Sequence, residues 1–591
     1  MFNRDVEVAQ CPTATRFKTD WRLATTGRYY CIGGAAVEKN RFGEGLLLSW
    51  ARGDTSAPVL TQHCRNLVED DKADLFVTRL SRCGSSNDSS RCHSGICSLL
   101  ETTGINKLIS ASDGSLFTVA AWPSTYLSVL FQKSVSHFRS NILGNRGDMT
   151  FFWDGLFSSA DGQTLRAAHP LLKCRSPEAL SRSVPLVVHQ DGAPFGKGLC
   201  VDTISFSSLV GKGIQIECKL AIASHVAEAG EELDDGFWDE LCKEFVCLGT
   251  GRDRNGSILC PTADGGIGCE FIFLFKKLDL EAMANKVRVH NYLLGDEICP
   301  SCLGNRTTRP FTNLSSTAEW TDTVLDNDDY VARARSQSSH KLVQSELFNK
   351  YTIQFDSMHV MDHHGVAGIC IASSLQYVVD NCVQLGGTKE ARMAVVNQKA
   401  DVFYTRHEVS SRLPDLKLGN LRSSDDSWTT LAGQLIKAAS TRHYVPFLRS
   451  LLDELFPAPV PIEKAMRRAV SSLNRFYEII YQSGMFLNAA ELAELDLEAY
   501  RLRKYWMLLR HLSQLDGKLQ WQIPPKGHYF CHLQKQCSLI NCRYLANYGE
   551  ESLMGVIAGV WASSKAGPYR STIQRHALLK VLLLWVGTIG L

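Results

Sequence analysis

Three acidic side chains stand where a fold could bring them together. Asp191 follows the apolar run 184–189, Asp279 follows the apolar run CEFIFLFKK, and Glu551 falls in the first turn of a helix predicted to begin near Asn547. Converging carboxylates are the ligands that Mg²⁺ or Mn²⁺ prefers, and a pair of such ions can promote in-line attack on a phosphodiester. We therefore predict that these three residues are catalytic and bind two Mg²⁺ or Mn²⁺ ions.

Each acid also has a simpler structural explanation. Asp followed by Gly, as at 191–192, is common in Asx turns. Glu550 and Glu551 could do no more than complement the dipole of the predicted helix, with Asn547 and Glu550 as its capping pair. The catalytic prediction therefore depends on the three acids meeting in the fold.

A second group has the spacing of a metal site. The sequence CPSC places Cys299 and Cys302 in a Cys-x-x-Cys knuckle, which is half of a tetrahedral zinc site and needs two further nitrogen or sulfur ligands. His359 with His363, or with His364, could complete it. A redox role for the two thiols is weaker, because no thioredoxin-like unit surrounds them.

Basic residues alternate with aromatic ones in two later segments, and a third basic group follows the acidic helix. As DNA contacts they would hold phosphates without reading sequence, and as the alternative they are ordinary solvated helix faces. The candidates for DNA contacts are Arg467, Arg468, Arg475, Arg503, Lys504 and Arg570.

The elements that must position the acids follow one another in a recognisable order. Strands are predicted at 184–189, 199–209 and 214–223, followed by a helix within 231–249 and a fourth strand at 269–277. This is the order of a ribonuclease H-like core, in which strands one and four lie side by side. The predicted fold is therefore α/β, with a mixed ribonuclease H-like sheet split by a large helical insertion.

Five segments are predicted along the chain. They are an N-terminal region of unknown role (1–150), the first part of the core (151–298), a zinc-knuckle region with a polar linker at 326–341 (299–365), a helical insertion (366–520), and the end of the core with the acidic helix (521–591). Strand-like or mixed structure is expected at 519–533.

Composition limits the class of protein. The chain has 591 residues, 45% of them hydrophobic and 21% charged, which is typical of a folded soluble protein of more than one domain. The net charge of +2 neither supports nor excludes nucleic acid, since local clusters decide phosphate binding. The first residues do not resemble an export signal, and the apolar end 577–591 is interrupted by Lys580, so we expect a core element there rather than a membrane anchor.

Taken together, the motifs resemble those of CACTA-type (En/Spm) transposases of the DDE class, over about 150–580. DGAPFG at 191–196 is similar to the family's first-acid turn, CPSC at 299–302 to its cysteine knuckle, FDSMHV at 355–360 to its D-x-M-H motif, and ESLMG at 551–555 to its E-R-F-M-G motif. The sequence departs from the family at Asp362 and His363, where the family has Lys and Asn.

The resemblance implies a nuclear enzyme that cuts and transfers strands of double-stranded DNA at transposon ends, using water and then a 3′-hydroxyl as nucleophile. Asp191 and Glu551 would be its first and third metal-binding acids, and Cys299, Cys302 and His359 would be structural. Asp279 as the second acid rests on its place after the fourth predicted strand. No membrane partner is expected, and self-association into a homo-oligomer is left open. The alternatives are a catalytically inactive derivative that still binds DNA, and an unrelated α/β protein.

Overall fold

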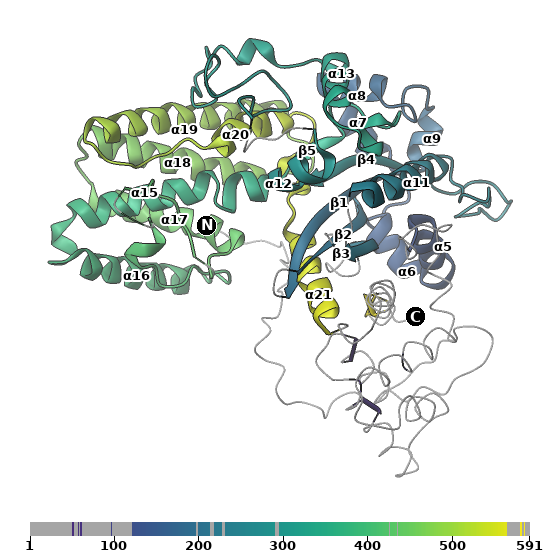
Figure 1. Cartoon of the computed structure of the whole chain (residues 1–591), viewed down its shortest axis with the longest axis horizontal. Helices are drawn as coiled ribbons and strands as arrows, with labels where there is room; N and C mark the ends of the chain where they lie inside the picture. Colours follow the sequence, from purple (N-terminus) through teal and green to yellow (C-terminus); the bar gives the residue numbers. More distant parts are fainter. Residues whose placement is uncertain are drawn as a thin grey trace. The chain divides into compact units, whose positions relative to one another are not determined.

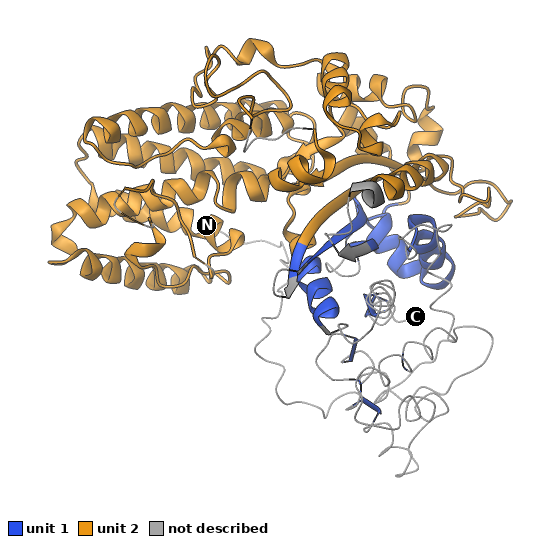
Figure 2. Cartoon of the chain, viewed as in Figure 1, with its two compact units in different colours: residues 1–146, 193–229, 552–591 blue, residues 147–192, 230–551 orange. Residues whose placement is uncertain are grey.

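The computed structural model describes residues 121–563, except 197–198, 213–217, 227–230, 290–294, 423, 425 and 434, and also residues 50–51, 57, 60–61, 96, 580–581 and 584–585. Most of the predicted N-terminal region, the candidate DNA contact Arg570 and most of the apolar C-terminal segment therefore lie outside the described residues. The chain forms two compact units, coloured in Figure 2: residues 1–146, 193–229 and 552–591, and residues 147–192 and 230–551. All candidate site residues discussed below belong to the second unit.

The fold is mixed α/β with one five-stranded mixed sheet, visible in Figure 1. Its strands are β1 (Ser183–Gly196), β2 (Leu199–Ser208), β3 (Leu220–Val226), β4 (Glu270–Leu278) and β5 (Ile353–Phe355), in the spatial order β3-β2-β1-β4-β5. β4 is parallel to both β1 and β5, whereas β2 and β3 are antiparallel. The predicted adjacency of the first and fourth strands is confirmed.

The central strand β4 is apolar because both of its faces are covered. Every residue of Glu270–Leu278 is buried, as expected for a strand inside a parallel arrangement. Helix α11 (Glu231–Gly249) packs on β4, where the ring of Phe245 stacks on Phe273 at 4.6 Å. The short helices α7 (Thr150–Phe157), α8 (Ala160–Ala168) and α9 (Pro177–Ser181) precede the sheet, and the indole of Trp153 donates to the carbonyl of Ser183 over 2.8 Å.

The long segment after β5 is helical, as its sequence pattern predicts. Its main helices are α15 (Val366–Asn381), α16 (Lys389–Arg406), α17 (Ala438–Leu455), α18 (Pro461–Gln482), α19 (Ala489–Leu515) and α20 (Pro525–Gln536). The remaining helices of three residues or more include α5 (Pro123–Lys133), α6 (Val135–His137), α12 (Leu280–Ala282), α13 (Asn327–Gln337), α14 (Lys341–Gln344) and α21 (Tyr548–Ser563).

Three local predictions were wrong. Residues 326–341 were expected to be a polar linker, but α13 forms there because Tyr330 and Ala334, four residues apart, give it a buried face. Residues 519–533 were expected to be strand-like or mixed, but α20 begins at Pro525, a residue well suited to a first helical turn. A turn was expected after His189, but β1 continues through Asp191 to Gly196.

None of the described helices is both long enough and apolar enough to span a bilayer.

Candidate functional site

The register of two parallel strands brings the first two acids together. His189 of β1 pairs with Lys277 of β4, and Asp191 and Asp279 each lie two residues further along. Because side chains alternate between the faces of a strand, both acids fall at the same level and on the same face as that pair. Asp279 also begins α12, where its carboxylate accepts a hydrogen bond from the amide of Ala282 over 2.5 Å.

A buried ion pair fixes the start of α21 to this part of the sheet. The Nζ of Lys277 lies 2.5 Å from a carboxylate oxygen of Glu550, and each side chain is only 2% exposed. The expected start of the helix is confirmed, with Glu550 and Glu551 in its first turn. The side chain of Asn547, in contrast, makes no hydrogen bond with the described residues, so the predicted capping pair does not form.

Asp362 ties the same helix to the helical segment. Its buried carboxylate accepts hydrogen bonds from the hydroxyls of Tyr548, the first residue of α21, and of Tyr477 in α18. Burial raises the pKa of Asp362 to about 6, although the Arg442 guanidinium and both hydroxyls oppose this. The first turn of α21 is thus held from the sheet and from α18.

Asp356 and His359 form a second support beside Glu551. The fully buried carboxylate of Asp356, just after β5, accepts from the backbone amides of Met358 and Asn547 over 2.9 and 3.0 Å. It also bonds to Nδ1 of His359 over 2.5 Å. The other ring nitrogen of His359 lies 3.7 Å from a carboxylate oxygen of Glu551. The histidine therefore sits between a structural acid and a candidate catalytic acid.

The electrostatics of the three candidate acids show that they share one site. Burial, and then the negative charges of Asp279 and Glu551, raise the pKa of Asp191 to about 8. Burial likewise raises the pKa of Glu551, although the charge of His359 and a hydrogen bond with Asp191 oppose it. The ionised forms of these carboxylates repel one another, and a bound cation would relieve the repulsion.

His359 is correspondingly basic. Burial alone would lower its pKa, but the hydrogen bond and charge of Asp356, with the charges of Asp279 and Glu551, raise it to about 9. The site therefore combines a cluster of acids with a protonated histidine, His359, next to Glu551. Among the described residues, the oxygen atoms of these carboxylates lie further apart than the donor atoms of the cysteine and histidine group described below.

These shifts predict how stability changes with pH in buffer without divalent cations. The folded chain keeps a proton on Asp191 up to about pH 8 and on His359 up to about pH 9, whereas the unfolded chain loses them near the ordinary values of 3.8 and 6.5. The contribution of these two groups to the free energy of unfolding should therefore fall as pH rises from about 5 to about 9, since the folded state holds both protons more tightly than the unfolded state does. Urea denaturation of wild type and of Asp191→Asn at several pH values isolates the share of Asp191, and the variant should gain stability relative to wild type as pH rises. A difference between the two proteins that does not change with pH would contradict the assignment.

A second cluster is formed by Cys299, Cys302, His528 and His532. All four are buried, and their donor atoms lie within 4.8 Å of one another. The two cysteines lie in a loop of the segment that connects β4 to β5. The two histidines are four residues apart on α20 and so share one face of that helix. A buried Cys2His2 group of this kind could bind a structural metal ion such as zinc.

The distances fit one tetrahedral ion. Tetrahedral zinc, with bonds of about 2.3 Å to sulfur and about 2.0 Å to nitrogen, requires about 3.6 Å between sulfur and nitrogen and about 3.3 Å between two nitrogens. Here Cys299 Sγ and His532 Nε2 lie 3.3 Å apart, as do Cys302 Sγ and His528 Nε2, and the two Nε2 atoms lie 3.1 Å apart.

The surroundings of the cluster also suit a metal ion. The amides of Ser301 and Gly304 donate to the sulfurs of Cys299 and Cys302, and hydrogen bonds from Cys299 and from both histidines lower the pKa of Cys302. The thiolate is the form that binds metals. A Cβ atom at Gly304 would come within 2.8 Å of the His528 ring, so the loop can approach the helix this closely only because residue 304 is glycine.

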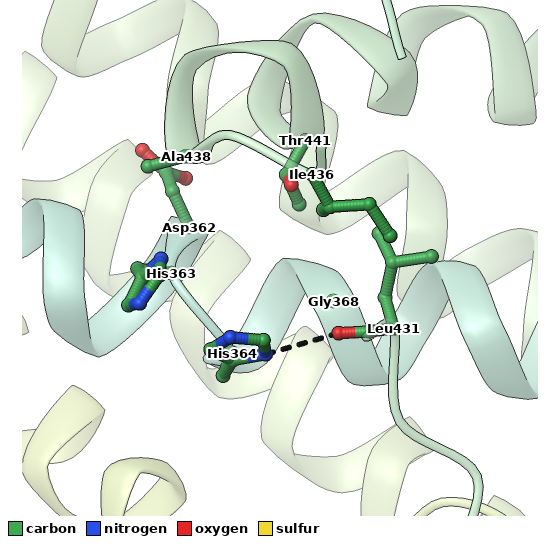
Figure 3. A pocket seen from close by; sticks show the side chains of 8 residues that line it. All are labelled: Asp362, His363, His364, Gly368, Leu431, Ile436, Ala438 and Thr441. Atoms are coloured by element: carbon green, nitrogen blue, oxygen red, sulfur yellow. Dashed lines mark hydrogen bonds between the residues drawn. The ribbon is translucent and has the colours of Figure 1, made fainter. Parts of the chain in front are cut away.

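The predicted partners of the knuckle are corrected by this arrangement. His359 lies against Asp356 and Glu551, and Figure 3 shows His363 and His364 beside Asp362 in a pocket lined also by Leu431, with His364 Nδ1 3.1 Å from the Leu431 carbonyl oxygen. The two histidines that complete the group are instead His528 and His532, more than two hundred residues beyond the cysteines. The sequence does carry a signal for them, because His-x₃-His is a usual zinc spacing, but it lies in the segment 519–533 for which the pattern predicts strand-like or mixed structure.

Helix α20 connects the two clusters. Lys526, in its first turn, donates to the carbonyl of His363 over 2.6 Å. Burial lowers its pKa to about 8, while the charges of Asp279 and Asp356 act to raise it. A helix held by the Cys2His2 group thus carries a basic side chain to the acid cluster.

The basic residues proposed to contact DNA are partly engaged within the protein. Arg467 pairs with Asp453 at 2.6 Å, and Arg475 pairs with Glu478 at 3.0 Å and with Glu494 at 2.7 Å. Arg503 donates to the carbonyl of Ala499 over 3.2 Å. Of the described candidates, Arg468 and Lys504 are exposed. These ion pairs reduce the charge that the two arginines offer to a phosphate.

Comparison with known proteins gives no family assignment. No model of a known protein family matches the chain, and no curated protein is significantly similar to it. The function must therefore be argued from the site itself.

Proposed function

We propose that this protein is a metal-dependent phosphoryl-transfer enzyme with a ribonuclease H-like core, which cleaves and transfers strands of double-stranded DNA as a CACTA-type transposase does. The observation that supports it most is the meeting of Asp191 in β1, Asp279 just after the neighbouring parallel strand β4, and Glu551 in the first turn of α21. The parallel pairing of β1 and β4 after a three-strand run and a helix supports the core assignment.

Mg²⁺ or Mn²⁺ at this site would activate the attacking oxygen and stabilise the leaving oxygen. Asp191, Asp279 and Glu551 would supply its ligands, because each offers hard carboxylate oxygens. Asp191, whose pKa is raised to about 8, would give up its proton on metal binding. His359 would keep Glu551 in place through the pair that it forms with Asp356.

The Cys2His2 group would hold structural zinc in this proposal. Zinc would fix α20 to the loop after β4, and so would fix Lys526 close to Asp279 and Asp356. The protein would act in the nucleus, where the DNA that it cuts is found.

The direct test is nicking of supercoiled DNA by the purified full-length protein. We expect relaxed and linear products with Mg²⁺ or Mn²⁺, and none when Ca²⁺ is the only added divalent ion, because Ca²⁺ favours longer bonds and looser geometry. Salt-sensitive DNA binding without cleavage under all these conditions would instead point to a catalytically inactive, transposase-derived DNA-binding protein. A protein that neither binds nor cleaves DNA would refute both hypotheses.

A further inference from the structure

Two cysteines outside the metal group are neighbours in the hairpin that connects α11 to β4. The two arms of the hairpin run antiparallel, with Pro261 bridged to Ile267. Next to this bridge, the carbonyl oxygen of Cys260 accepts a hydrogen bond from the amide of Gly268 over 2.8 Å. Cys269 therefore lies one residue beyond the partner of Cys260 on the opposite arm.

Glycines let the two arms approach this closely. A Cβ atom at Gly268 would come within 2.9 Å of the carbonyl oxygen of Cys260. The turn between the arms is closed by Gly265, which has a φ of 82° and donates its amide hydrogen to the carbonyl of Thr262 over 2.9 Å. The backbone thus fixes the two cysteines as neighbours before any bond joins them.

The two side chains act as a thiol and an acceptor sulfur. Cys260 is fully buried, whereas Cys269 is partly exposed. The thiol of Cys260 donates a hydrogen bond to the sulfur of Cys269. This bond lowers the pKa of Cys269, although burial opposes it, and the same bond together with burial raises the pKa of Cys260. Because the thiolate is the reactive form, Cys269 is the nucleophile of the pair.

Other described cysteines outside the metal group show what is particular to this pair. Cys370 and Cys531 are buried, and burial raises the pKa of each thiol. Cys542 bonds to Cys537, but both are buried. An accessible thiol with a lowered pKa beside a second thiol is instead the arrangement found in cysteines that respond to oxidants.

We propose that Cys269 and Cys260 are a redox-sensitive pair, which hydrogen peroxide converts to a disulfide. The Cys269 thiolate attacks one peroxide oxygen, the O–O bond breaks, and a sulfenic acid forms while the released hydroxide takes up a proton as water. The Cys260 sulfur then attacks the Cys269 sulfur, so that the S–S bond forms, the S–O bond breaks and a second water leaves with the Cys260 proton. The two thiols lose two electrons, and one peroxide is reduced to two waters. A dithiol reductant reverses the reaction by thiol–disulfide exchange.

The disulfide would close a ring directly before the central strand. Cys269 is followed by Glu270, whose amide donates to the carbonyl of Arg182 over 3.0 Å and whose carboxylate pairs with Arg182 and Arg175. Oxidation would therefore tie the hairpin to the anchored first residue of β4. A cross-link of this kind mainly restricts the unfolded chain, so the urea midpoint of the oxidised protein should be higher than that of the reduced protein. This site goes beyond the proposed enzyme activity and does not depend on it.

Peptide mapping of the full-length protein tests the proposal. Trypsin cuts after Arg254 and after Lys276, so the peptide 255–276 contains these two cysteines and no other. The folded protein is treated with hydrogen peroxide, unfolded in urea, labelled with N-ethylmaleimide and digested. The peptide should then be lighter by two hydrogen atoms and carry no label, and treatment with dithiothreitol before labelling should restore both labels. The internal control is Cys531, alone in the tryptic peptide 527–535, which should stay labelled.

Two single variants separate the nucleophile from its partner. In Cys260→Ser, peroxide should leave Cys269 as a sulfenic acid that dimedone traps. In Cys269→Ser, Cys260 should keep its thiol under the same conditions, because it is buried and protonated. Equal trapping in the two variants would contradict the assignment of Cys269 as the nucleophile.

The mapping of wild type decides the proposal even if a variant fails to fold. Full labelling of both cysteines after peroxide treatment would overturn it, as would a disulfide from either of them to a different cysteine. DNA cleavage is not measured in this experiment, so its failure is separable from failure of the proposed function.

Discussion

Replacing His528 by alanine should remove the metal ion from the Cys2His2 group and lower the free energy of unfolding by roughly 5 kcal/mol or more, because the binding free energy of a structural zinc ion, about 10–16 kcal/mol in zinc-finger peptides, is part of the folding free energy. This is the largest effect on stability that we expect from one substitution. Cys302→Ser should act in the same direction, since it exchanges a soft thiolate for a poor zinc ligand.

Zinc per chain, measured by elemental analysis, and urea denaturation together test this expectation. Cys531→Ala is the matched control, because Cys531 is buried in the same helix next to His532 but is not part of the metal group. It should keep the zinc and lose only about 1 kcal/mol, as for other small deletions in a core. Absence of zinc from wild type, or equal losses of stability in His528→Ala and Cys531→Ala, would argue against a metal site.

Removing one of the candidate catalytic carboxylates should abolish DNA cleavage and leave the fold intact. We expect Asp191→Asn and Glu551→Gln each to lower the Mg²⁺-dependent nicking rate on the order of 10³-fold or more, corresponding to about 4 kcal/mol of transition-state stabilisation. Stability without divalent cations should rise slightly in both variants, because the repulsion that raises the pKa of Asp191 is relieved.

The control for this experiment is Asp264→Asn, at an exposed acid that accepts turn hydrogen bonds from the hydroxyl of Thr262 and the backbone of Gly266. It should cleave as wild type does. Binding of a labelled duplex should be equal or slightly tighter in Asp191→Asn and Glu551→Gln, because each loses one negative charge. Wild-type cleavage rates in either variant would remove that residue from the proposed catalytic set.

Two supports explain why the third acid can be so far along the chain from the first two. Lys277 of β4 holds Glu550, and Asp362 holds Tyr548, so the first turn of α21 is fixed at two residues just before Glu551. A buried ion pair is a costly way to fix a helix, because both charges lose their hydration. Here Lys277 lies two residues before Asp279, and Glu550 lies one residue before Glu551. A small displacement at this pair would therefore separate the candidate acids.

The amino-acid sequence by itself determined the elements whose pattern is strong. The apolar run of β4 and the long helices from Val366 onward follow from local periodicity, and Asp191, Asp279 and Glu551 could be selected from their places beside predicted elements. The start of α21 near Asn547 was also predicted, although the capping pair on which that prediction rested does not form. Local signals failed where they were short or ambiguous. Helix α13 has only 11 residues, most of them polar, and α20 opens on two prolines, so neither gives a clear period.

Only the tertiary structure decided which side chains meet. The sequence identified Cys299 and Cys302 as half of a metal site but assigned the wrong histidines, because His359 is nearer along the chain whereas His528 and His532 are nearer in space. The four side chains come together only because α20 packs against the distant loop that carries the cysteines. That contact depends on the glycine at 304, which leaves room for the His528 ring. Tertiary packing also places His359 beside Glu551, because the chain after β5 lies against the start of α21. The residues next to His359 in the sequence do not predict this contact.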